Sequence, residues 1–154
     1  GRGAGLSGDG LTRKINAIKK AIEVNHPNPG DAIDVLAKVG GFDIAGMAGM
    51  FLGGAAFGVP VVIDGFISCV AALIAQRICP AAGEYMIASH VSKEPAAQLI
   101  LKALGKEAVI HGEMCLGEGS GAVALFPFLD MGIAVYESMS TFDDIHVEQY
   151  EELV

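Results

Sequence analysis

The alternation of short apolar runs with helical segments constrains the fold of this chain more than any other feature. The β-branched run 61–64 is followed by an apolar helical segment at 69–78. Further strand candidates at 85–88 and 108–110 precede helical segments at 94–104 and 122–140. Strands and helices that alternate through short links are typical of an α/β fold with a mostly parallel sheet. The sequence therefore predicts a fold of that class.

Three helices are expected before the first strand. Apolar residues recur on one face of segment 11–24, and Asp31 is a plausible N-cap for a shorter helix that runs to residue 39. Segment 44–57 is apolar almost all round, so we expect a buried helix there. Pro127 predicts a kink or break within the last helix.

Polar and glycine-rich residues follow each predicted strand. They are Asp64-Gly65, the segment 89–92 and the segment 116–121. Ligands of parallel α/β sheets bind beyond the carboxyl ends of the strands. The sequence therefore predicts that these three segments converge on one site.

The segment 116–121, Leu-Gly-Glu-Gly-Ser-Gly, is the most unusual of the three. Its glycines allow backbone N–H groups to approach a ligand, and a helix that began near Ser120 would favour an anion there. Glu118 is not a residue that turns prefer for local hydrogen bonds. One interpretation is an anion-binding loop that carries a general base. The other is an ordinary strand-to-helix turn with a solvated glutamate.

Several other residues could each have either a functional or a structural role. Asp64 could bind ribose hydroxyls or cap the helix that follows it. Ser89 and Ser92 could hold phosphate oxygens or cap a helix, and His90 between them could act in acid–base chemistry or be structural. Lys14 could be the charge partner of a phosphate or simply a solvated helix residue.

Composition limits the classes of function. The formal net charge of −8 and the pI near 4.8 argue against nucleic-acid binding. The apolar run 59–75 is interrupted by Asp64 and Gly65, so we expect a strand and a helix there and no membrane span. Hydrophobic residues make up 52% of the chain, which indicates an oligomer interface or contact with another part of the same protein.

The cysteines and histidines do not suggest a metal site. The three cysteines have no C-x-x-C spacing, which favours a reduced cytoplasmic location, and Cys115 is expected to be a buried neutral thiol. The four histidines are scattered, so the sequence predicts no metal and no cofactor.

Five sequence blocks resemble the nicotinate-nucleotide–dimethylbenzimidazole phosphoribosyltransferase family. They occur in family order and together cover nearly the whole chain to residue 142: 1–6 (GRGAGL), 34–49 (DVLAKVGGFDIAGMAG), 60–68 (PVVIDGFIS), 88–95 (ASHVSKEP) and 116–122 (LGEGSGA). The resemblance implies a three-layer αβα, Rossmann-like fold. It also implies transfer of phosphoribose from nicotinate mononucleotide to 5,6-dimethylbenzimidazole, which yields α-ribazole 5′-phosphate and nicotinate.

The resemblance also implies roles for individual residues. Glu118 would be the catalytic base that removes the benzimidazole N–H proton. The expected substrate-binding residues surround it or lie in the other blocks: Arg2, Gly3, Lys14, Asp64, Ser89, Ser92, Leu116, Gly117, Gly119 and Ser120. Among these, Lys14 and Ser92 would hold the nucleotide phosphate, Asp64 would face the ribose, and Leu116 would line the benzimidazole pocket.

The family's chains are about twice as long as this one. We therefore expect residues 1–142 to form the C-terminal catalytic portion of a longer protein, followed by an acidic tail at 143–154, and we expect the missing N-terminal half to be needed for activity. The family also implies a homodimer. Two alternatives stay open: a non-catalytic fragment that binds nucleotide phosphate or serves in assembly, and a related phosphoribosyltransferase that uses another aromatic base.

Overall fold

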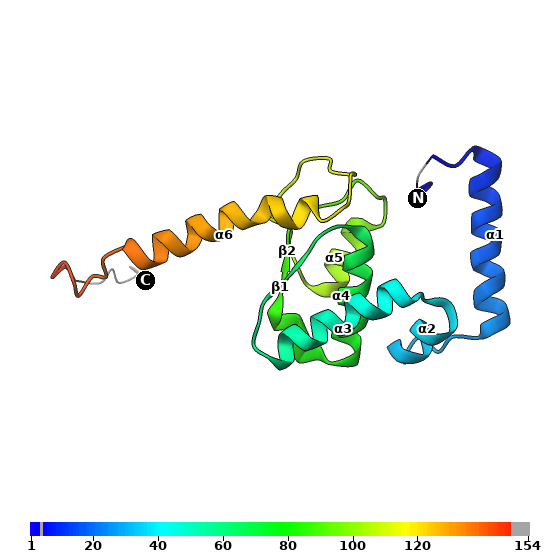
Figure 1. Ribbon diagram of the computed structural model, residues 1–154, viewed down its shortest axis with the longest axis horizontal. Helices are drawn as coiled ribbons and strands as arrows, with labels where there is room; N and C mark the ends of the chain where they lie inside the picture. The colour runs from blue at the N-terminus through cyan, green and yellow to red at the C-terminus, as the bar shows by residue number, and fades with distance from the viewer. Residues whose placement is uncertain (4, 149–154) are drawn as a thin grey trace, which may run out of the picture.

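The computed structural model describes residues 1–3 and 5–148, and its core lies where two helices cover a small sheet (Figure 1). Helices α3 (Phe42–Ala56) and α4 (Phe66–Ile78) pack on each other and on strand β1 (Val61–Ile63). A 3₁₀ helix, η1 (Pro80–Tyr85), links α4 to strand β2 (Met86–Ala88). The core is rich in small residues, which let these elements approach closely: Ala71, Ala72, Ala75 and Ala82 are all fully buried.

Strands β1 and β2 pair in parallel, with Val61 opposite Met86 and Ile63 opposite Ala88. A single parallel bridge between His90 and Ile110 extends the pairing beyond β2, where the N–H of Ile110 donates to the carbonyl of Ser89 at 2.9 Å. The strands predicted at 61–64 and 85–88 are confirmed, and the strand predicted at 108–110 is reduced to this bridge. The described part of the chain is thus a mostly helical α/β unit with a two-stranded sheet. It is smaller than the expected three-layer αβα fold with its mostly parallel sheet.

The two N-terminal helices stand beside this core (Figure 1). Helix α1 (Gly8–Asn25) begins after Ser7, whose Oγ accepts from the N–H of Gly10 at 3.1 Å. Helix α2 (Ala32–Val39) begins after Asp31, whose carboxylate accepts from the N–H groups of the second and third helical residues. Both predicted helices and the Asp31 cap are confirmed.

Helix α3 forms where it was predicted, but it is not buried all round. Ala48 and Phe51 are buried, whereas Met50 is 66% exposed and Phe42 is fully exposed. The reason is that α3 contacts the core along one side, and the described part of the chain places no element over its other side. The prediction of an enclosed helix was therefore wrong.

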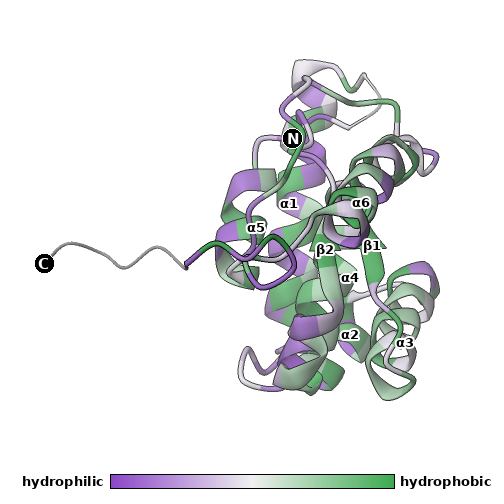
Figure 2. Ribbon diagram, turned by 90° about the vertical axis from the view of Figure 1, so that its left-hand side faces the viewer, coloured by the Kyte–Doolittle hydropathy of each residue, from purple (hydrophilic) through white to green (hydrophobic). Residues whose placement is uncertain are grey.

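Helix α6 (Ser120–Ser138) projects from the body of the molecule, whereas the shorter α5 (Ala97–Leu104) packs against α4 (Figure 1). Helix α6 continues through Pro127, so the helix is not broken there, and the alternative of a kink stays a prediction. Its first two turns hold the buried Gly121 and Leu125. Beyond them Leu129 is partly buried, and six large apolar residues are half or more exposed: Phe126, Phe128, Met131, Ile133, Val135 and Tyr136. Figure 2 shows apolar residues on several helices, α3, α4 and α6 among them.

By length and composition alone, α6 could cross a membrane, and it is the one helix of the described residues that passes this test. Asp130 lies near its middle. A carboxylate at the centre of a membrane span costs about 2.5–3.5 kcal/mol. The run 59–75, which was predicted not to be a span, is a strand followed by a helix as expected.

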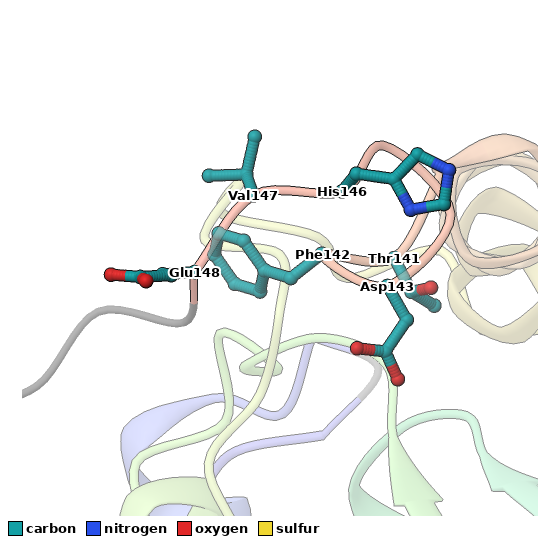
Figure 3. A pocket seen from close by; sticks show the side chains of 6 residues that line it. All are labelled: Thr141, Phe142, Asp143, His146, Val147 and Glu148. Atoms are coloured by element: carbon teal, nitrogen blue, oxygen red, sulfur yellow. The ribbon is translucent and has the colours of Figure 1, made fainter.

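A compact turn follows α6. The carboxylate of Asp144 accepts from the N–H and the hydroxyl of Thr141 at 2.8 and 2.7 Å, and these hydrogen bonds hold the pKa of Asp144 below its usual range. A shallow hollow lies on this turn, lined by Thr141, Phe142, Asp143, His146, Val147 and Glu148 (Figure 3). The predicted acidic tail, 143–154, is described only to residue 148, and the remainder lies outside the described residues.

Candidate active site

The residue that follows β1, Asp64, is hydrogen-bonded to the first turn of α6. Oδ1 of Asp64 accepts a hydrogen bond from the N–H of Ala122 at 3.0 Å. Asp64 is therefore a helix cap, but for α6 and not for α4, the helix that follows it in sequence. Helix α4 begins after Gly65 without a side-chain cap. This correction could not come from local spacing, because the two residues are 58 positions apart.

The carboxyl end of β2 supplies two buried polar residues, Ser89 and His90. Ser89 is fully buried, and its Oγ lies 2.6 Å from the carbonyl oxygen of Ile63 and 3.0 Å from that of Asp64. The same oxygen lies 3.0 Å from Nδ1 of His90. The hydroxyl thus bonds within the protein, between the two strands, and phosphate binding by Ser89 stays a prediction.

The last glycine of the segment 116–121 lies against these groups. A side chain at Gly121 would collide with the ring of His90 and with Oδ1 of Asp64. Close packing therefore requires glycine at this position. The predicted convergence of the three segments that follow the strands is confirmed, because Asp64, His90 and Gly121 meet at one point.

The loop before α6 has an uncommon backbone. Gly117, Glu118 and Gly119 have φ values of +76°, +58° and +76°, so three consecutive residues are left-handed. Glycine tolerates this conformation, but glutamate adopts it at a cost of order 1–3 kcal/mol. Strain of this kind clusters at functional sites. The Glu118 side chain is exposed, so its carboxylate is accessible to a ligand.

The predicted helix start at Ser120 is confirmed, but two N–H groups of this region are already engaged. The N–H of Ser120 donates to the carbonyl of Gly117 at 3.0 Å, and that of Ala122 donates to Asp64. An anion at this helix end would therefore not receive these two hydrogen bonds in the observed conformation. Anion binding by Gly117, Gly119 and Ser120 stays a prediction.

A second group of predicted residues gathers at the N-terminal loop. Nζ of Lys14 donates to the carbonyl of Gly1 at 3.3 Å, and Gly3 is left-handed with φ +65° beside the same ammonium group. Gly1 lies against Glu94 and Pro95 in the turn after β2. The loop, the α1 lysine and this turn are thus neighbours, with the Arg2 side chain exposed.

The turn 92–95 is tied to the loop that leads to Glu118. Oγ of Ser92 accepts from the N–H of Glu94 at 3.3 Å. Because α5 begins only at Ala97, Ser92 stabilises a turn and does not cap that helix. The N–H of Lys93 donates to the carbonyl of Met114 at 3.0 Å, and its Nζ lies 3.4 Å from the Glu113 carboxylate.

Two residues at the edge of the loop are more open than expected. Leu116, the predicted wall of a base pocket, is 76% exposed. Cys115 is exposed, so the prediction of a buried thiol was wrong, because the loop 111–118 runs over the surface. Cys69 is the buried cysteine. Burial, with a smaller effect of the Asp64 charge, raises its pKa from 9.0 to about 11.

Sequence reasoning left two features of the site unassigned. For His90 the sequence favoured a structural role over acid–base chemistry, but it did not predict the contact with Gly121. Glu113 is also left-handed, with φ +52°, and nothing in the local sequence marks it. Within residues 1–3 and 5–148, no three His, Cys, Asp or Glu side chains are grouped as a potential metal site.

Comparison with known proteins identifies the family to which this chain belongs. A family model described as "Phosphoribosyltransferase" matches residues 1–147. The nicotinate-nucleotide–dimethylbenzimidazole phosphoribosyltransferase of Acetivibrio thermocellus is 50% identical over 98% of this chain, and that of Ruminiclostridium cellulolyticum is 53% identical over 99%. The crystal structure of CobT from Thermus thermophilus superposes with a TM-score of 0.85 at 36% identity over 97% of the chain.

The chain therefore belongs to the nicotinate-nucleotide–dimethylbenzimidazole phosphoribosyltransferase family, as its five sequence blocks indicated. It spans 43% and 44% of the lengths of the two relatives and 44% of the Thermus chain.

Proposed function

We propose that this chain carries the catalytic loop for transfer of phosphoribose from nicotinate mononucleotide to 5,6-dimethylbenzimidazole. The proposal rests on the exposure, conformation and position of Glu118. It is an exposed carboxylate in a left-handed conformation between two left-handed glycines, directly before α6, whose first turn contacts Asp64 and His90. Membership of the family supports the choice of substrates.

In the proposed reaction, the Glu118 carboxylate removes the N–H proton of the benzimidazole. The other ring nitrogen attacks C1′ of the ribose and forms the new C–N bond with inversion. The bond from C1′ to nicotinate breaks, and its electron pair returns to the pyridine nitrogen, which loses its positive charge. A positioned base of this kind contributes about 10²–10⁴-fold to the rate.

Six other predicted residues divide among three roles in this proposal. Lys14, Arg2, Gly3 and Ser92 would receive the phosphate, because the N-terminal loop, the Lys14 ammonium and the turn after β2 are neighbours. Leu116 would form part of the base pocket, because its exposed apolar side chain lies beside Glu118. The hydrogen bond of Asp64 to Ala122 supports a role in holding the loop, with the ribose contact as a further expectation.

We also propose that the exposed apolar surface of α6 is covered in the active protein by a second copy or by a segment like those that the longer relatives contain. Six large apolar residues beyond Leu125 are half or more exposed, listed above for this helix. The chain spans less than half the length of the relatives. Cytoplasmic location and the absence of nucleic-acid and membrane partners stay expectations.

The test joins this chain to the part of the Acetivibrio thermocellus relative that it does not match, and measures nicotinate release beside the chain alone. Glu118→Gln should lower kcat by about 10²–10⁴-fold. The matched control is Glu113→Gln, since Glu113 is also exposed and left-handed on the same loop and should leave turnover near wild type. Full turnover in Glu118→Gln would refute the base and favour a loop that only binds an anion.

A further inference from the structure

The His90 ring occupies the point where both strands end and α6 begins. It is only 5% exposed. One edge of the ring, Cε1 and Nε2, lies over Gly65, and the Nδ1–Cε1 edge lies against Gly121. The imidazole is therefore enclosed between the residue that follows Asp64 and the second residue of α6.

The hydrogen bond to Ser89 fixes the orientation of the ring. The Ser89 hydroxyl has one proton, and its shortest contact, 2.6 Å, is to the carbonyl oxygen of Ile63. We assign that proton to the carbonyl. Nδ1 of His90, 3.0 Å from the same Oγ, then carries a hydrogen and donates it. A fully buried serine thus holds the ring from the strand side.

The fixed ring sets the position of the first turn of α6. Even one added methyl group at Gly121 would overlap the ring and approach Oδ1 of Asp64. The N–H of the next residue, Ala122, donates to that same Oδ1. The helix start is therefore packed against the imidazole and hydrogen-bonded to the carboxylate, three residues after Glu118.

We propose that His90 is a positioning residue for Glu118. It does not touch substrate; it sets the start of α6 and with it the strained turn that presents the carboxylate. The inference rests on the proposed function of Glu118. The competing explanation is that His90 only adds to stability.

The first measurement uses the chimeric enzyme described above, with His90→Leu and His90→Asn. Leucine fills the space but cannot donate to Ser89, whereas asparagine retains a donor near Nδ1. We expect His90→Leu to lower kcat by about 10–100-fold with little change in KM for nicotinate mononucleotide, because small displacements of a catalytic group have effects of that size. His90→Asn should restore much of the loss. Normal turnover in His90→Leu would overturn the proposal.

The second measurement separates positioning from stability. If His90 acts through Glu118, then His90→Leu should cause almost no further loss of kcat in the Glu118→Gln background. An equal loss in both backgrounds would overturn the proposal, because a purely structural effect is independent of the carboxylate. Thermal unfolding of each variant gives the folded fraction used to normalise kcat.

The third measurement needs no activity. Hydrogen exchange in the chain itself should be faster at the Ala122 N–H in His90→Leu than in the wild type, and unchanged exchange there would overturn the proposal. If the wild-type chimera released no nicotinate, the proposed function would fail. The exchange rate would still decide whether His90 holds this turn.

Discussion

The first turns of α6 and the rest of the same helix meet very different surroundings. At the start, Gly121 and Leu125 are buried. Asp64 accepts a hydrogen bond from the helix backbone, and the His90 ring leaves no room for a side chain at position 121. Farther along, six large apolar residues are half or more exposed, and the helix projects from the body of the molecule (Figure 1). Both regions are apolar in sequence. Burial on α6 therefore depends on whether the rest of the protein contacts that part of the helix, and not on the hydrophobicity of the helix itself.

The largest expected effect comes from removing a buried side chain near the beginning of α6. Leu125→Ala should lower the free energy of unfolding by about 2–5 kcal/mol, because Leu125 is fully buried. Met131→Ala is the control on the projecting part, where the side chain is 56% exposed, and should change stability little in this chain. Urea unfolding of the two variants gives both values. Equal losses would mean that the two parts of α6 are equally enclosed in solution.

The second effect is a dependence of stability on alkaline pH, caused by the buried Cys69 of α4. The pKa of Cys69 is raised from 9.0 to about 11 by burial, so the folded state favours the neutral thiol. That stability is complete below pH 9 and is lost as the pH rises towards 11. A rise of this size in the pKa corresponds to about 2–3 kcal/mol.

Stability measured from about pH 8 to 11 should therefore fall less steeply in Cys69→Ala than in the wild type. Cys115→Ala is the control, because that cysteine is exposed and should keep the wild-type slope. If Cys69→Ala kept the same slope as the wild type, the thiol would not be shielded from water.

The third effect compares two glycines of the same helix. Gly121→Ala should cost about 1–3 kcal/mol, because the new methyl group overlaps the His90 ring. Gly132→Ala has open space around it and should stabilise the helix by about 0.5–1 kcal/mol. Thermal unfolding should therefore shift in opposite directions for the two variants. A stabilising Gly121→Ala would show that the first turn can move away from His90.

The smallest effect concerns a local feature that does not depend on α6. Asp31→Ala should cost about 1 kcal/mol, because it removes the side-chain acceptor of two N–H groups at the start of α2. Asp31→Asn, which keeps an acceptor, is the control and should lose less. Chemical denaturation measures both. A loss as large as that of Leu125→Ala would mean that the cap also supports the core.

Local signals in the sequence were sufficient for most elements. The Asp31 cap, the positions of the strands at 61–63 and 86–88, and the residue at which α6 begins were all predictable, because capping, β-branched and glycine residues mark them locally. The convergence of the segments after the strands was also predictable, since parallel strands end at the same edge of a sheet. The family was evident from the five blocks, of which the one at 116–122 contains Glu118.

Only the tertiary structure decided which groups hold the site together. Asp64 accepts a hydrogen bond from a helix N–H that lies 58 positions later, and the His90 ring leaves no room for a side chain at Gly121. Neither contact can be predicted from the spacing of residues within one segment. It also decided that one side of α3 and most of α6 are exposed, although their composition is that of buried helices. The physical reason is that burial and long-range hydrogen bonds depend on which surfaces meet. Periodicity and turn chemistry describe one segment at a time.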